Sequence, residues 1–87
     1  MILTRNLKLN MSGEDVYDIK VKLFELGYYS KSITKISNKT FGKDTEKAVI
    51  NFQKKNDDKN NKPLDADGIV GPLTWEAIEK AYSVLQE

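Results

Sequence analysis

Two adjacent tyrosines, Tyr28 and Tyr29, are the side chains in this sequence best suited to contact a ligand. A tyrosine combines a flat apolar ring face with a polar hydroxyl, so it can stack on an apolar surface and hydrogen-bond at its edge. Neighbouring side chains in an extended segment point in opposite directions. We therefore expect one of the two rings to be buried and the other to be available to a ligand.

Cationic and amide side chains lie along residues 43–56, a segment with helical periodicity. Lys43 and Lys47 share its exposed side and could meet carboxylates, although lysines on such a face are commonly solvated without a partner. Asn51 and Gln53 flank Phe52 and offer amides close to the core, where amides satisfy a loop carbonyl more often than a ligand. Trp75 is the only tryptophan, and its predicted place in the first turn of a helix favours a structural role over a stacking surface.

The sequence contains no cysteine and no histidine. Thiolate and imidazole metal sites, thiol nucleophiles and all Ser–His or Cys–His dyads are therefore excluded. Paired carboxylates remain available, but a carboxylate active site needs a deep cleft, and a domain of this size leaves little room for one. We expect no catalytic residue and no cofactor.

Acidic residues crowd the segment 57–67 and raise the question of a calcium site. An EF-hand loop needs Asp at its first position, Gly at its sixth and Glu at its twelfth. With Gly68 in the sixth position, Pro63 and Thr74 occupy the first and the twelfth. The motif fails at both ends, and we expect no metal ion.

Length and charge limit the remaining functions. A chain of 87 residues forms one domain, which we expect to span residues 1–87 with its core at about 7–85. It contains 14 Lys and Arg and 13 Asp and Glu residues, and the resulting net charge of +1 supplies no general attraction for nucleic acid or anionic lipid. No apolar run is long enough for a signal peptide or a membrane anchor.

Glycines recur with a period of 29 residues, at Gly13, Gly42 and Gly71. Each is followed by apolar or small residues at helical spacing, and Pro72 suits the first position of a helix. The predicted helices cover about residues 14–26, 43–56 and 72–85. None could bury its apolar stripe alone, so the pattern predicts an all-α fold, a small three-helix domain with a 29-residue internal repeat.

The helical spacing also predicts which side chains form the core. We expect burial of Val16, Ile19, Leu23 and Leu26 in the first helix, Ala48, Val49 and Phe52 in the second, and Leu73, Ala77, Ile78, Ala81 and Leu85 in the third. Gly27 is placed to end the first helix in the left-handed conformation.

Three blocks of residues follow the repeat in order. They read Ser12-Gly13-Glu14-Asp15-Val16 with Leu26-Gly27-Tyr28-Tyr29, then Phe41-Gly42 with Ala48-Val49 and Phe52-Gln53, then Asp67-Gly68-Ile69-Val70-Gly71-Pro72 with Thr74-Trp75. Over residues 7–82 the chain resembles the peptidoglycan-binding domain that accompanies many bacterial and phage cell-wall hydrolases. Asn10 and Lys39 stand where the family usually has glycine, and Lys20 replaces a common glutamine.

The resemblance implies a non-catalytic, carbohydrate-binding module that binds peptidoglycan and targets a tethered wall hydrolase, such as an endolysin or an amidase, to its substrate. It implies a monomer located outside the cell or in the cell wall. A helical domain of this kind could instead dock a protein or serve as a structural module of spore or wall. That alternative stays open.

Two other functions are less consistent with the residues. A helix-turn-helix nucleic-acid binder concentrates Lys and Arg on its recognition helix, whereas the third predicted helix carries Glu76, Glu79 and a single Lys80. The prodomain of matrix metalloproteases resembles the same fold, but the thiol of its zinc-blocking switch is absent here.

The predicted ligand surface lies where the end of the first helix approaches the loop 67–70 and the start of the second helix. Free backbone N–H groups at helix starts suit carboxylates and acetamido oxygens, and the tyrosines offer a stacking face. The candidate ligand-binding residues are Tyr28, Tyr29, Lys43, Lys47, Asn51, Asp67 and Trp75.

Overall fold

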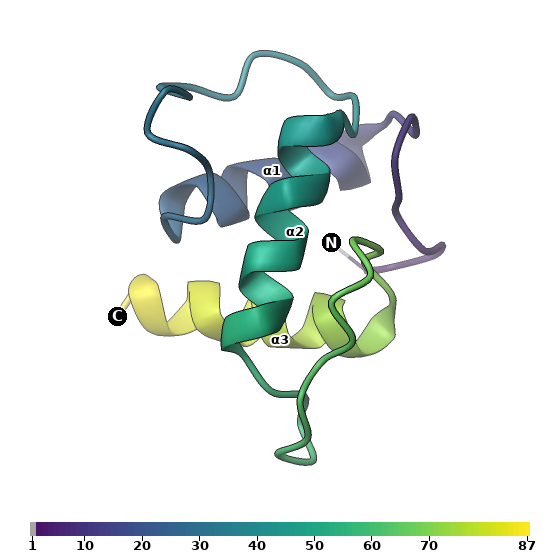
Figure 1. The fold of residues 1–87 in the computed structure, drawn as a ribbon, viewed down its shortest axis with the longest axis vertical. Helices are drawn as coiled ribbons and strands as arrows, with labels where there is room; N and C mark the ends of the chain where they lie inside the picture. Colours follow the sequence, from purple (N-terminus) through teal and green to yellow (C-terminus); the bar gives the residue numbers. More distant parts are fainter. Residues whose placement is uncertain (1) are drawn as a thin grey trace.

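The computed structural model describes residues 2–87 (Figure 1). Over this range the chain forms three helices, α1 (Glu14–Glu25), α2 (Lys43–Lys55) and α3 (Pro72–Leu85). The same residues contain no strand, only isolated bridges between loops. The expected all-α three-helix domain is therefore confirmed, with helix ends within one residue of the prediction.

The repeat glycines are the N-cap residues of the three helices. A glycine has no side chain to accept a hydrogen bond from the first turn, so another group must do so. In α1 and α2 this group is an aspartate: Asp15 Oδ1 accepts from the N–H of Val16, and Asp44 Oδ1 accepts from the N–H of Thr45, each at 2.9 Å. In α3, Pro72 at the first position removes one N–H that would need a partner.

The helices enclose one core. In Figure 1, α2 runs across α1 and α3, and α1 packs against both of them. The core consists of Leu7, Val16, Ile19, Leu23, Phe41, Ala48, Val49, Phe52, Leu64, Val70, Trp75 and Ile78. Ala77 and Ala81 pack at its edge, so most of the predicted inward positions are confirmed.

Two predicted core positions were wrong. The side chain of Leu73 is 41% exposed and that of Leu85 is 51% exposed. Leu73 lies in the first turn of α3 and lines a surface hollow, and Leu85 belongs to the last turn, which projects beyond α1 and α2 (Figure 1). Leu26, the C-cap residue of α1, packs at the edge of the core as Ala77 and Ala81 do.

Lys22 joins α1 to α3. Its ammonium forms ion pairs with Asp18 on α1, at 2.9 Å, and with Glu79 on α3. The same nitrogen lies 5.8 Å from the centre of the Trp75 ring and 5.5 Å from that of Tyr82, within cation–π range. These contacts hold α1 and α3 side by side through charged as well as apolar groups.

The segment before α1 ties the two inter-helix loops together. Leu7 and Val70 exchange backbone hydrogen bonds of 3.0 and 2.8 Å, which fix the chain just before α3. The N–H of Phe41 donates to the carbonyl of Met11 at 2.8 Å, which fixes the chain just before α2. Asn10 reaches a positive φ of 75° between these contacts, as expected of an asparagine in a glycine position.

A buried lysine of α1 holds the loop before α2. Lys20 is only 4% exposed, and its Nζ donates to Asn38 Oδ1 at 2.9 Å and to the carbonyl of Thr40 at 2.7 Å. The N–H of Thr40 donates back to Asn38 Oδ1 at 3.0 Å. The loop is thus held against α1 by an ammonium whose two partners are neutral oxygens.

A buried glutamine of α2 holds the loop before α3 in the same way. Gln53 Nε2 donates to Asp67 Oδ1 at 3.1 Å and to the carbonyl of Ile69 at 3.0 Å. Both acceptors lie 29 residues after those that Lys20 uses. The internal repeat therefore extends to the loops. In the first loop the charged group is the donor, Lys20, and in the second it is the acceptor, Asp67.

Candidate functional site

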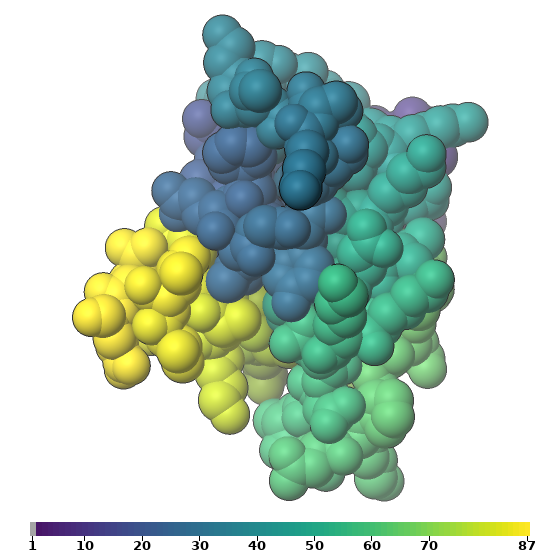
Figure 2. Space-filling model, turned by 60° about the vertical axis from the view of Figure 1, so that its left-hand side comes forward, coloured from purple at the N-terminus to yellow at the C-terminus, as the bar shows by residue number. Residues whose placement is uncertain are grey.

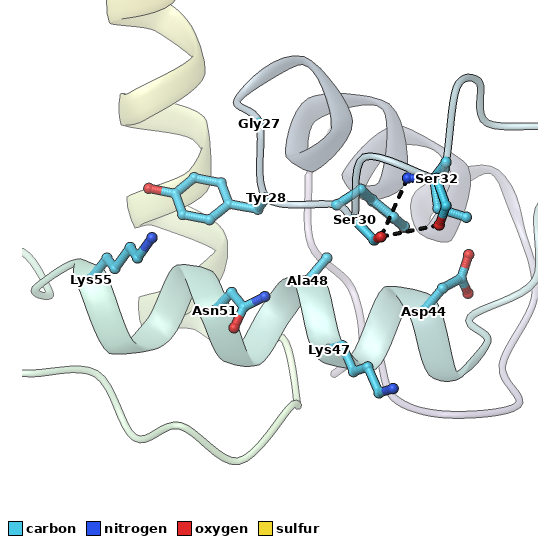
Figure 3. A pocket seen from close by; sticks show the side chains of 11 residues that line it. Gly27, Tyr28, Ser30, Ser32, Asp44, Lys47, Ala48, Asn51 and Lys55 are labelled. Carbon is cyan, nitrogen blue, oxygen red and sulfur yellow. Dashed lines mark hydrogen bonds between the residues drawn. The ribbon is translucent and has the colours of Figure 1, made fainter.

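A groove of about 460 Å³ lies between α2 and the segment 27–33 that follows α1. Both elements lie on the face of the molecule shown in Figure 2, and Figure 3 shows the groove from close by. Its lining consists of Gly27, Tyr28, Tyr29, Ser30, Ser32, Ile33, Asp44, Lys47, Ala48, Asn51 and Lys55.

The end of α1 fixes where the tyrosines lie. Gly27 adopts a positive φ of 87°, its N–H donates to the carbonyl of Phe24 at 3.1 Å, and the N–H of Tyr28 donates to the carbonyl of Leu23 at 3.0 Å. This is the Schellman arrangement, which satisfies the last helical carbonyls and reverses the chain. The predicted role of Gly27 is confirmed, and the chain leaves α1 alongside α2.

The expectation that one tyrosine is buried and the other free was wrong, because both are half-buried and both line the groove. Tyr29 donates its hydroxyl to Thr45 Oγ1 at 2.8 Å, and burial raises the pKa of Tyr29 to about 12. Tyr28 packs edge-on against Phe52, with ring centres 5.1 Å apart, and accepts a hydrogen bond from Asn56 Nδ2 at 3.1 Å. The reversal at Gly27 turns both rings toward α2.

The second wall is one face of α2. Asp44, Lys47, Asn51 and Lys55 are all exposed and recur at intervals of three or four residues, which places them along one side of a helix. In Figure 3, Lys55 extends toward the Tyr28 end of the groove and Asp44 toward the turn of Ser32. The groove thus has aromatic and hydroxyl groups on one side and amide and charged groups on the other.

Three predicted site residues lie elsewhere. Asp67 accepts a hydrogen bond from Gln53 and lines another surface hollow. Trp75 is part of the core and only 7% exposed. Lys43 is the first residue of α2 and does not line the groove. The predicted meeting of the loop 67–70 with the tyrosines does not occur. A side chain added at Gly68 would contact Glu46 and Ile50, which lie on the opposite face of α2 from the groove.

Comparison with protein families gives one match. The family model described as "Putative peptidoglycan binding domain" matches residues 12–78, which include α1, α2 and the first half of α3. The chain belongs to this peptidoglycan-binding family. No curated protein matches the chain. Membership supports peptidoglycan binding, an association with the cell wall, and a binding rather than a catalytic role.

The groove of this family member includes residues that sequence reasoning missed. Asp44 and Lys55 continue the helical spacing of Lys47 and Asn51, so periodicity alone could have identified them. Ser30, Ser32 and Ile33 carry no such signal, because they lie in a loop whose path is set by the turn at Gly27.

Neither metal-binding clusters nor membrane-spanning helices occur in the described part of the chain. Within residues 2–87, His, Cys, Asp and Glu side chains nowhere gather in groups of three or more that could hold a metal ion. None of the helices over these residues combines the length and apolarity needed to cross a bilayer.

Proposed function

We propose that the chain is a non-catalytic module that binds peptidoglycan in the groove between α2 and residues 27–33 and so brings a cell-wall hydrolase to its substrate. The observation that carries this proposal is the family match over residues 12–78. The groove supports it, since it is the hollow that gathers the exposed Lys47 and Asn51 with both tyrosines.

The chemistry of the groove suits this ligand. Peptidoglycan presents apolar sugar faces, acetamido and peptide amides, and carboxylates. Tyr28 and Tyr29 offer ring edges and faces, Asn51 and the serines exchange hydrogen bonds with amides, and Lys47 offers a cation to carboxylates. Binding in an open groove on so small a domain gains little free energy once the cost of ordering the ligand and the side chains is subtracted. We therefore expect a Kd in about the micromolar range or weaker.

Weak binding is sufficient for a targeting module. A catalytic domain tethered to the wall experiences a high effective concentration of substrate, which depends on the linker as well as on the affinity. The hydrolase would be an endolysin or an amidase of bacterial or phage origin that acts outside the cell, with this domain as a monomeric attachment. The same fold docking a protein partner is the alternative.

Co-sedimentation with purified wall sacculi tests the proposal. The isolated chain should sediment with sacculi and leave their turbidity unchanged. Asn51→Ala should lower the bound fraction several-fold, because it removes an exposed amide of the groove. Asn60→Ala is the matched control, since Asn60 is an exposed loop residue that does not line the groove.

Two results would overturn the proposal. A chain that stays in the supernatant with sacculi from several wall types would favour a protein-docking role. A chain that clears the suspension without any added enzyme would contradict the non-catalytic assignment.

A further inference from the structure

A second hollow adjoins the groove. It measures about 180 Å³, lies between the loop 33–40 and the start of α2, and shares Ile33 and Asp44 with the groove. The two hollows are therefore adjacent, with these residues on the border between them. We call them together the double groove.

Lys20, which is only 4% exposed, is one of the residues that line the second hollow. Its two hydrogen-bond partners, Asn38 Oδ1 and the carbonyl of Thr40, are neutral, and an ammonium has three N–H donors. In the described chain no carboxylate lies within ion-pair distance of Lys20. Burial lowers the pKa of Lys20, and the nearby Asp44 opposes this effect only in part. Burying a cation without a carboxylate partner costs free energy. The ammonium of Lys20 can therefore gain from pairing with the carboxylate of a ligand.

The whole double groove is positively charged. Four lysines line it, Lys20, Lys35, Lys47 and Lys55, against the single carboxylate of Asp44. Over residues 2–87 none of these lysines forms an ion pair. Asp44 is itself engaged with the first turn of α2. The surplus of three positive charges stands out in a chain whose net charge is +1.

From this arrangement we infer that the double groove binds the peptide part of peptidoglycan by a free carboxylate, which Lys20 and the surrounding lysines receive, while the tyrosines and Asn51 contact the adjoining amides. The inference rests on the proposed function and specifies its ligand. Carboxylate is favoured over phosphate because the matched family concerns peptidoglycan, whose own anionic groups are carboxylates. The glycan backbone contributes apolar and amide contacts but little charge.

Modified sacculi test the ligand. Sacculi are first stripped of phosphate polymers, and half are then amidated so that their peptide carboxylates become neutral. The chain should bind amidated sacculi about threefold to tenfold more weakly, and salt should weaken binding to the unmodified ones. Full binding to amidated sacculi or to peptide-free glycan strands would overturn the inference. So would binding lost when the phosphate polymers are removed.

Variants of the double groove test its residues. Lys35→Gln combined with Lys55→Gln should lower binding to unmodified sacculi about threefold to tenfold and leave binding to amidated sacculi unchanged. Lys54→Gln combined with Lys80→Gln removes two exposed charges outside the double groove and is the matched control. Wild-type binding by the Lys35→Gln, Lys55→Gln variant would overturn the inference.

The variant Asn38→Asp distinguishes the structural role of Lys20 from its proposed role in binding the ligand. It keeps both hydrogen bonds of Lys20 but places a carboxylate against the ammonium, so the fold is retained while the charge is paired. Binding should fall several-fold, and an unchanged affinity would overturn the role of Lys20. If the wild-type chain fails to bind any sacculi, the proposed function fails; if it binds all of them irrespective of carboxylates, only the inference fails.

Discussion

At the scale of single residues, the ammonium of Lys20 donates a hydrogen bond to the neutral side chain of Asn38 in the loop before α2, and it has no carboxylate partner among the described residues. Asn38→Asp should raise the free energy of unfolding by about 1 kcal/mol at neutral pH, because a carboxylate would replace a neutral oxygen 2.9 Å from the buried ammonium. Urea denaturation measures this change. Asp67→Asn, the reverse exchange 29 residues later, is the comparison and should be destabilising. A destabilised Asn38→Asp protein would show that the loop cannot accept the charge.

Tyr29 gives the fold a pH dependence in the alkaline range. Its pKa is about 12 in the folded state against an ordinary value of 10.0, so the folded protein binds more protons between these values. The resulting stability is fully present below pH 10 and is lost as pH rises toward 12. Tyr29→Phe should unfold more easily at neutral pH, because the bond to Thr45 is missing, and should lose less stability above pH 10.

Two measurements check this prediction. Denaturant unfolding at several alkaline pH values should show the wild-type and Tyr29→Phe stabilities converging. The ultraviolet absorbance of tyrosinate should show a tyrosine that ionises near pH 12 in the wild type, measured in a Tyr82→Phe background because the hydrogen bond with Glu25 also raises the pKa of Tyr82. If Tyr29→Phe retains that late titration, the assignment to Tyr29 is wrong.

At the scale of elements, the three helix-starting glycines share a position in the repeat but not a backbone conformation. Gly13 has a φ of 148°, whereas Gly42 and Gly71 have φ of −92° and −94°, which any residue can adopt. A Cβ at Gly13 would lie 2.7 Å from Asp15 Oδ1, whereas one at Gly71 would find its nearest neighbour at 3.6 Å. The repeat is therefore less strict in backbone geometry than in sequence.

Gly13→Ala should accordingly lower the free energy of unfolding by about 2 kcal/mol, and Gly71→Ala by less than about 1 kcal/mol. Thermal unfolding followed by circular dichroism ranks the two variants. Equal melting temperatures would mean that the segment before α1 adjusts to a side chain at Gly13.

At the scale of the whole molecule, we predict one cooperative unit. The core draws residues from all three helices and from the segment before α1, and Leu7 is fully buried with Val70. Unfolding should therefore be two-state, with the far-UV circular dichroism of the helices and the fluorescence of buried Trp75 changing together. Transitions at different denaturant concentrations would show that α3 unfolds apart from α1 and α2.

The sequence by itself determined the helices and most of the core. Glycine spacing located the three helix starts, and helical periodicity identified inward residues such as Ile19, Phe52 and Ile78. These features depend on contacts between residues a few positions apart, so they can be derived without knowing how the helices pack. Gly27 belongs with them, because a left-handed helix end is also a local preference.

Only the tertiary structure decided which candidate residues share a surface. The direction of the chain after Gly27 places Tyr28 and Tyr29 beside Lys47 and Asn51, whereas Asp67 lies toward the other face of α2. The burial of Lys20 and the exposure of Leu73 and Leu85 likewise depend on where loops and neighbouring helices end. Periodicity gives the side of a helix on which a residue lies, but the partner that covers that side is set by packing between segments far apart in the sequence.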